Sequence, residues 1–226
     1  MAHQTWRINR PLLDFVSIPV YNYNMLEYLG SKAFLGDLSL EDADVLAYWA
    51  SKSQCILEFG SGGSTQIMSQ CAVQHIDSVE TSPEWAAITQ SRLDLIPGHA
   101  PVVFHAYTTK FDHTYNMVFV DGVDHLRRDF AIAAWSNLHT NGVMIFHDTR
   151  RSRDFQHVAW IAQLHHNEIS RIDVNVPASN GQSSNITVIH KKSQEPYVNW
   201  NQTEGKPAWA YGLPDEELHP LWSQYD

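Results

Sequence analysis

The stretch ILEFGSGGSTQIMSQ, residues 56–70, begins with the apolar run typical of a buried strand and ends with the pattern typical of a helix. Between the two lies a loop with almost no side chains, Gly60-Ser61-Gly62-Gly63-Ser64. Glycines permit a tight turn and a close approach to the backbone, and a helix start presents free N–H groups. The order strand, glycine loop, helix therefore predicts a nucleotide-type cradle. Such glycine-rich stretches also occur in ordinary turns, so the surrounding residues must show whether this loop binds a cofactor.

Strand and helix patterns alternate around this loop. A helix is predicted from Ser39, which Asp42 follows three residues later as in a capping box. Further helices are predicted at 65–74, 83–95, 125–138 and 154–166, and strands at 55–59, 74–80, 101–107, 115–121, 142–148, 169–176 and 185–190.

The connections between these strands predict the topology. The first five strands are separated by helices or long connections, which predicts parallel pairing with helices on both faces. The last two are joined by PASNGQSS, residues 177–184, which leaves no room for a helix and predicts an antiparallel pair. The expected fold is α/β, a Rossmann-like seven-stranded, mostly parallel sheet with a C-terminal antiparallel β-hairpin.

Composition limits the function classes. The chain has 226 residues, 43% of them hydrophobic, and a formal net charge of −10. This length and composition predict one sizeable globular domain. The negative charge argues against a nucleic-acid or anionic-membrane partner; the dense basic positions are Arg127, Arg128, Arg150, Arg151 and Arg153. No apolar run approaches ~18 residues, and the N-terminus lacks the apolar core of a signal peptide, so we expect a cytoplasmic protein.

Three segments are predicted along the chain. Residues 1–37 are mixed and aromatic, which predicts an N-terminal arm with short helices, and residues 38–191 carry the alternating pattern of the main domain. Residues 192–226 are rich in Pro, Trp, Tyr and Asn with little periodicity, which predicts an arm or a lid over the substrate pocket. The two terminal arms could also join copies of the chain into a homo-oligomer.

Two acidic residues flank the glycine loop at informative distances. Glu58 stands two residues before Gly60, and Glu80 ends the next strand, twenty residues after Gly60. An acid at that strand end is where a ribose diol is held, because a carboxylate accepts hydrogen bonds from both hydroxyls.

Two cofactor classes share this arrangement. Dinucleotide enzymes use G-x-G-x-x-G, and here Thr65 stands in place of the third glycine. Proteins that bind S-adenosylmethionine use acid-x-G-x-G-x-G, which the stretch from Glu58 to Gly62 fits and from which Ser64 departs.

Residues 54–190 resemble a class I S-adenosylmethionine-dependent methyltransferase of the small-molecule O-methyltransferase type. Three stretches carry the resemblance: ILEFGSGGST, SVETSPEW, and YNMVFVDGVDHLRRDFAIAAWSNLHTNGVMIFHDTRR. The resemblance implies S-adenosylmethionine as cofactor and a set of cofactor-binding residues, which are Glu58, Gly60, Ser61, Gly62, Ser64, Thr65, Glu80, Thr81 and Asp121. Trp85 and Tyr107 are expected neighbours of the adenine.

Catalytic candidates stand where the fourth and fifth strands end, at Asp121, His147 and Asp148. Chemistry in open α/β sheets gathers at this edge. Methyl transfer to a hydroxyl requires that the hydroxyl proton be removed or neutralised. One reading makes His147 or Asp148 the general base; the other makes Asp121, His147 and Asp148 the ligands of a divalent metal ion. His147 makes magnesium a less natural choice, because that ion prefers oxygen ligands.

We therefore predict transfer of a methyl group from S-adenosylmethionine to a hydroxyl of a small-molecule acceptor. The alternatives are an NAD-type Rossmann oxidoreductase and a non-catalytic S-adenosylmethionine-binding module. The chain also has thirteen histidines, of which His105, His113 and His125 lie near strand-end loops and could line the pocket.

Overall fold

A computed structural model of the chain describes residues 35–108 and 110–192. The predicted C-terminal arm or lid, residues 192–226, and the predicted N-terminal arm, residues 1–37, lie almost wholly outside the described residues. Both remain predictions, as does an oligomer formed through them.

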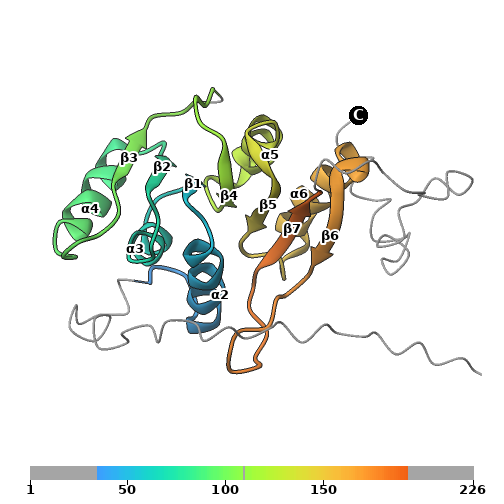
Figure 1. Cartoon of the computed structure of the whole chain (residues 1–226), viewed down its shortest axis with the longest axis horizontal. Helices are drawn as coiled ribbons and strands as arrows, with labels where there is room; N and C mark the ends of the chain where they lie inside the picture. Colours follow the sequence, from blue (N-terminus) through green and yellow to red (C-terminus); the bar gives the residue numbers. More distant parts are fainter. Residues whose placement is uncertain (1–34, 109, 193–226) are drawn as a thin grey trace, which may run out of the picture. The chain divides into compact units, whose positions relative to one another are not determined.

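The described residues contain a seven-stranded sheet in the order β3-β2-β1-β4-β5-β7-β6 (Figure 1). β1 to β5 pair in parallel, and β7 runs antiparallel to both β5 and β6. The predicted fold class is thereby confirmed. The strands are β1 Cys55–Phe59, β2 His75–Val79, β3 Val102–His105, β4 Tyr115–Val120, β5 Leu138–Phe146, β6 Ile169–Asp173 and β7 Thr187–Lys191.

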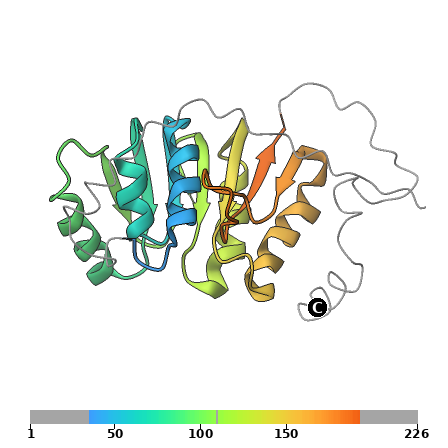
Figure 2. The same cartoon turned by 90° about the horizontal axis from the view of Figure 1, so that it is seen from below.

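Helices cover both faces of the sheet. They are α2 Leu40–Ser51, α3 Gly63–Ser69, α4 Pro83–Leu93, α5 Arg127–Trp135 and α6 Ser152–Leu164, with 3₁₀ turns at Asp124–Leu126 and His166–Glu168. α2 and α3 lie on one side of the sheet and stand before it in Figure 2, with α5 and α6 on the other side. On the α5/α6 side, Leu57 and Phe59 of β1 and Val118 and Val120 of β4 belong to one apolar core.

The two largest differences from the predicted element boundaries lie in α3 and β5. α3 ends at Ser69, well before the predicted residue 74. The predicted turn TNG, residues 140–142, lies inside β5 as a bulge, because Tyr115 pairs with Leu138 whereas Met117 pairs with Val143. The bulge places Asn141 at a φ of 65°, a backbone region that asparagine tolerates better than most residues.

The connection from β3 to β4, residues 106–114, has no helix among its described residues. Figure 1 shows it passing from the edge of the sheet to β4. Phe111 packs its ring against Phe59 at 5.7 Å, and Asn137 Nδ2 donates to the carbonyls of Phe111 and His113 at 3.0 and 2.9 Å. These contacts tie the connection to the α5/α6 side of the sheet.

The ends of β1 and β4 touch at Gly60. A Cβ added to Gly60 would lie 2.8 Å from the carbonyl oxygen of Asp121 and 2.8 Å from Cα of Gly122, and Gly60 has a φ of +87°. The Gly60 N–H donates to Val79 O at 3.0 Å, and the Asp121 N–H donates to Phe59 O at 3.0 Å. Gly60 is therefore required for the contact between the two strand ends, independently of any ligand.

We predict that Gly60→Ala lowers the free energy of unfolding by at least about 2 kcal/mol more than Gly98→Ala does, measured by urea denaturation. Gly98 is a matched control, because it also has a positive φ of +70° but no atom within 4 Å of an added Cβ. Equal losses in the two variants would show that backbone strain, and not the crowded contact, determines the cost at Gly60.

Candidate functional site

A cavity of about 330 Å³ opens where β1, β2 and β4 end. Seven of the nine predicted cofactor-binding residues line it, namely Gly60, Ser61, Gly62, Ser64, Glu80, Thr81 and Asp121. Val79, Val123, Phe130 and Leu38 add apolar wall. The parallel sheet brings these residues together from distant parts of the sequence, because all of its carboxyl ends meet at one edge.

Glu80 links the end of β2 to the glycine loop. One carboxylate oxygen accepts from the Ser61 N–H at 3.0 Å and from the Ser61 hydroxyl at 2.9 Å, and the other accepts from the Ser82 N–H at 2.9 Å. An ionised carboxylate offers about four acceptor positions, so Glu80 keeps capacity for a further donor. Its position in the cavity wall fits the predicted contact with a ribose hydroxyl.

Glu58 does not line the cavity, and its predicted contact with the cofactor is a correction. The side chain is fully buried behind the loop, where it accepts hydrogen bonds from the hydroxyls of Ser64, Thr65 and Ser78. Burial raises its pKa to about 7, although the three hydroxyl donors oppose that rise. Glu58 thus fixes the glycine loop and the start of α3 to the sheet.

Thr65 is also buried behind the loop, so its predicted contact with the cofactor is a second correction. Its hydroxyl oxygen accepts from the Gly62 N–H at 2.8 Å and donates to Glu58 at 2.7 Å. Together with the Ser61 N–H, which Glu80 accepts, two loop N–H groups are satisfied inside the protein.

The structure adds residues that the sequence patterns did not assign to the cavity. Residues 35–38 form part of the wall, although they lie before the first helix and show no periodicity. Trp85 lines the cavity as expected and donates its indole N–H to Ser61 O at 2.6 Å. Tyr107 is not among the lining residues; its ring lies against Phe130.

His147 lies at the end of β5, buried between two carboxylates. Nδ1 is 3.1 Å from Asp121 Oδ2, and Nε2 is 3.3 Å from Asp42 Oδ2. Burial by itself would lower the pKa of His147, but the hydrogen bonds to Asp121 and Asp42 outweigh it and raise the pKa to about 9. Burial opposes ionisation of Asp42 too, but the contacts with His147, the Asn185 N–H and Ser39 lower its pKa to about 2.

A closed ring of ion pairs and hydrogen bonds joins Asp121, His147 and Asp148. Arg127 donates to Asp121 and to Asp154, both at 2.9 Å. Arg151 donates to Asp154 at 2.7 Å and also to Asp148. The ring closes through Asn185, whose Nδ2 donates to Asp148 at 3.0 Å and whose N–H donates to Asp42 at 2.6 Å. The Asp148 backbone has a φ of +63° within this ring.

The predicted metal site does not fit this arrangement. Asp121, His147 and Asp148 do approach one another, with one ligand atom from each within 4.8 Å of the others. However, Arg127 Nη2 lies 2.9 Å from Asp121 and 3.8 Å from Asp148 and supplies the positive charge that a metal ion would supply.

The hydrogen bonds to Asp121 and Asp42 raise the pKa of His147, which disfavours its role as a general base; that role stays a prediction. An imidazolium between two carboxylates has no free lone pair to accept a proton at neutral pH. Of the three predicted catalytic residues, only Asp121 lines the cavity. His147 and Asp148 lie behind it in the ring and hold the ends of β4 and β5.

Comparisons with known proteins were made at the levels of sequence and structure. Neither a protein-family model nor a curated protein sequence matches this chain. An O-methyltransferase from Bacillus cereus, solved with S-adenosylhomocysteine, aligns with a TM-score of 0.57 at 16% identity over 75% of this chain and 88% of that chain.

Two further solved structures align over similar lengths. The O-methyltransferase TomG from Streptomyces achromogenes, solved with S-adenosylmethionine, gives a TM-score of 0.55 at 16% identity over 70% of this chain and 83% of that chain. The N-methyltransferase NodS from Bradyrhizobium japonicum, solved with S-adenosylhomocysteine, gives 0.52 at 12% identity over 77% and 99%. The chain therefore has the fold of class I S-adenosylmethionine-dependent methyltransferases.

The helices were also compared with the length and apolarity that a membrane span requires. None of those within residues 35–108 and 110–192 meets both requirements.

We predict that Arg127→Met lowers the free energy of unfolding by about 3–5 kcal/mol, because it leaves the buried Asp154 carboxylate without Arg127. Arg171→Ala is the control, since it breaks a pair with Asp173 that is exposed and should cost less than about 1 kcal/mol. Urea denaturation of both variants measures the difference. If Arg127→Met lost no more free energy of unfolding than Arg171→Ala, the ring of ion pairs would not stabilise the fold as predicted.

A second prediction concerns pH. His147 has a folded pKa of about 9 against its ordinary value of 6.5, so its protonation stabilises the fold fully below about pH 6.5 and ceases to do so as pH rises through about 9. The stability advantage of wild type over His147→Gln should therefore shrink by about 2–3 kcal/mol between pH 6 and pH 10. Denaturant titrations of both proteins at several pH values measure it. A constant difference across this range would refute the buried imidazolium.

Proposed function

We propose that the protein is a methyltransferase that binds S-adenosylmethionine in the cavity at the ends of β1, β2 and β4 and methylates a hydroxyl of a small molecule. The observation that carries the proposal is the charge of the cavity wall. Asp37, Glu80 and Asp121 line it, and no Lys, Arg or His side chain is among its described lining residues.

An acidic cavity suits the chemistry of this cofactor. S-adenosylmethionine carries a positively charged sulfonium and an ammonium group, which carboxylates attract. Arg127 and His147 largely compensate Asp121 from behind, so Asp37 and Glu80 contribute most of the attraction. Asp37 has no hydrogen-bond partner among the residues that the structure describes.

The same wall argues against a dinucleotide cofactor. A pyrophosphate needs positive charge or free backbone N–H groups at the glycine loop. Here the N–H groups of Ser61 and Gly62 are taken by Glu80 and Thr65. The NAD-type alternative therefore has the weaker support.

A hydroxyl acceptor is supported by the Asp121 carboxylate in the cavity wall and by the O-methyltransferases among the structural neighbours. Asp121 is the predicted catalytic residue that reaches the cavity, where it can accept a hydrogen bond from the acceptor hydroxyl and orient it. His147 and Arg127 fix the Asp121 carboxylate from the opposite side. These two residues are positioning residues in the proposed reaction.

We predict that S-adenosylhomocysteine and S-adenosylmethionine bind the full chain in isothermal titration calorimetry and that NAD does not. Glu80→Gln should weaken S-adenosylhomocysteine binding by about tenfold, since it removes the charge that strengthens the hydrogen bond to the ribose. Glu84→Gln is the control, an exposed acid in the first turn of α4. Binding of NAD alone, or equal affinity in the Glu80 and Glu84 variants, would contradict the proposal.

Turnover separates the enzyme from a binding module. Incubation with S-adenosylmethionine and a panel of small phenols, catechols and sugars should release S-adenosylhomocysteine with at least one acceptor, measured by mass spectrometry. Cofactor binding without product across hydroxyl acceptors, combined with methylation of an amine panel, would reassign the acceptor. Cofactor binding without any turnover would favour the non-catalytic module.

A further inference from the structure

A second cluster of ionisable side chains lies on the α5/α6 side of the sheet, over β2 and β3. Asp77 precedes Val79 by two residues on β2, so both side chains point to the same face, and Val79 belongs to the apolar core of that face. His75 precedes Asp77 by two residues and shares the face. His105 of β3 is the partner of Val79 in the parallel register.

No helix covers this part of the face among the described residues, because the β3–β4 connection contains none. The connection instead places His113 over β2. Asn137 Nδ2 holds the His113 carbonyl at 2.9 Å, so the backbone that carries the imidazole is fixed. His105 and His113 are absent from the cavity lining, which corrects the expectation that they could line the cofactor pocket.

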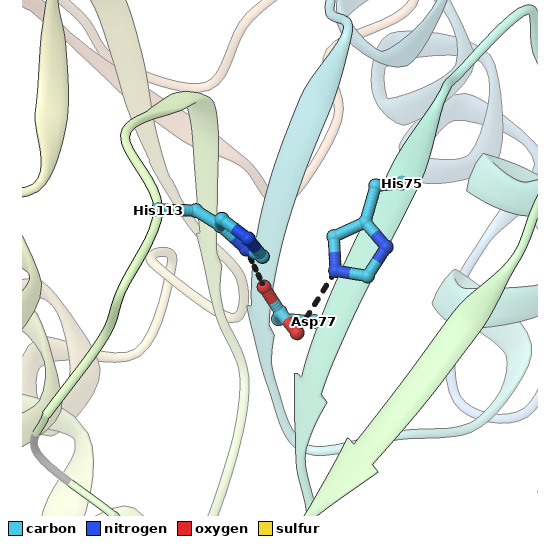
Figure 3. A group of neighbouring side chains, drawn as sticks. All are labelled: His75, Asp77 and His113. Carbon is cyan, nitrogen blue, oxygen red and sulfur yellow. Dashed lines mark hydrogen bonds and ion pairs between the residues drawn. The ribbon is translucent and has the colours of Figure 1, made fainter.

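Three imidazoles converge on the carboxylate of Asp77. His75 Nε2 and His105 Nε2 lie 3.0 and 2.6 Å from Oδ1, and His113 Nδ1 lies 3.0 Å from Oδ2. Figure 3 shows the rings of His75 and His113 on either side of Asp77. One nitrogen from each of these two rings and one Asp77 oxygen all lie within 4.8 Å of one another.

Two features of the cluster point to a bound cation. His75 Nε2 is buried and, despite its 3.0 Å distance to Asp77, has no hydrogen-bond partner among the described residues. A buried polar atom without a partner is costly, and a metal ion would satisfy it. In addition, ligands about 2.0–2.1 Å from a tetrahedral zinc ion lie about 3.3 Å from one another. His75 Nε2 and His113 Nδ1 each lie 3.0 Å from Asp77, one facing Oδ1 and the other Oδ2, which is near that spacing.

The carboxylate is prepared as a ligand. The Tyr115 hydroxyl donates to Asp77 Oδ2 at 2.7 Å. This hydrogen bond fixes the orientation of the carboxylate, as outer partners of metal ligands commonly do.

We propose that His75, Asp77 and His113 form a site for a divalent transition metal ion of the zinc type. Imidazole nitrogens favour zinc over magnesium or calcium, which prefer oxygen ligands. The ion would tie the β3–β4 connection to β2 where no helix covers the sheet. The site shares no residue with the cofactor cavity, so it is independent of the proposed methyl transfer.

The test uses the full chain, freed of metal by dialysis against a chelator and titrated with Zn²⁺ in a calorimeter. We expect one saturable equivalent and a higher melting temperature with Zn²⁺ present. His113→Gln should weaken the binding by at least about tenfold. His113 is 56% exposed, so this variant should fold, and circular dichroism checks that it does.

His166→Gln is the matched control, an exposed histidine outside the cluster whose loss should leave the zinc affinity unchanged. X-ray absorption of the zinc-loaded protein should show only nitrogen and oxygen ligands, at about 2.0–2.2 Å. The proposal is overturned by the absence of a saturable event, by equal affinity in wild type and His113→Gln, or by a sulfur ligand from Cys55 or Cys71.

Discussion

The close approach of Gly60 to Asp121 and Gly122 is the constraint on which the rest of the site depends. A Cβ at Gly60 would lie 2.8 Å from two backbone atoms at the end of β4, so the turn after β1 must have no side chain there. This contact places the glycine loop beside Asp121 and leaves the cavity between the loop, Glu80 and the start of the segment after β4. Gly60 in the glycine loop is therefore required by the packing of the two strand ends, whether or not a ligand is bound.

Behind the cavity, charge is balanced within the protein. Buried carboxylates are costly unless cations and hydrogen-bond donors surround them. Asp42, Asp121, Asp148 and Asp154 meet His147, Arg127 and Arg151 in one ring, which also joins α2, β4, β5 and α6. The cavity wall, by contrast, also holds Asp37 and Glu80, which pair with no described cationic side chain, whereas Asp121 belongs to both the ring and the wall. This contrast separates the structural acids from those available to a cationic ligand.

The sequence predicted the sheet, the loop and the edge at which the polar residues gather, because these follow from periodicity and from parallel connections. Glu80 was assigned correctly to the cavity wall because a strand end fixes the position of its side chain. The roles of Glu58, His147 and Asp148 were not predictable in the same way. Each depends on partners far along the chain, such as Asp42 for His147 and Asn185 for Asp148. A strand-end pattern cannot tell whether such partners already satisfy the side chain.

The histidine cluster was also not predictable from sequence patterns, because contacts between distant segments bring its members together. His75, His105 and His113 have no motif spacing that indicates a metal site, and alternation along β2 gives Asp77 only a face of the sheet. The cluster forms because the β3–β4 connection lacks a helix and brings His113 onto β2. The sequence patterns do predict a β3–β4 connection without a helix, but they do not show that it brings His113 onto the polar part of this face.

A crystal structure of the protein with S-adenosylhomocysteine tests the central claim most directly. The account predicts electron density for the cofactor product between the loop at Gly60–Gly62 and Trp85, with both ribose hydroxyls donating to Glu80 and no metal ion between Asp121 and Asp148. The ring from Asp42 to Asn185 should be unchanged. Density for the ligand away from Glu80, or a metal ion in place of Arg127 between Asp121 and Asp148, would contradict it.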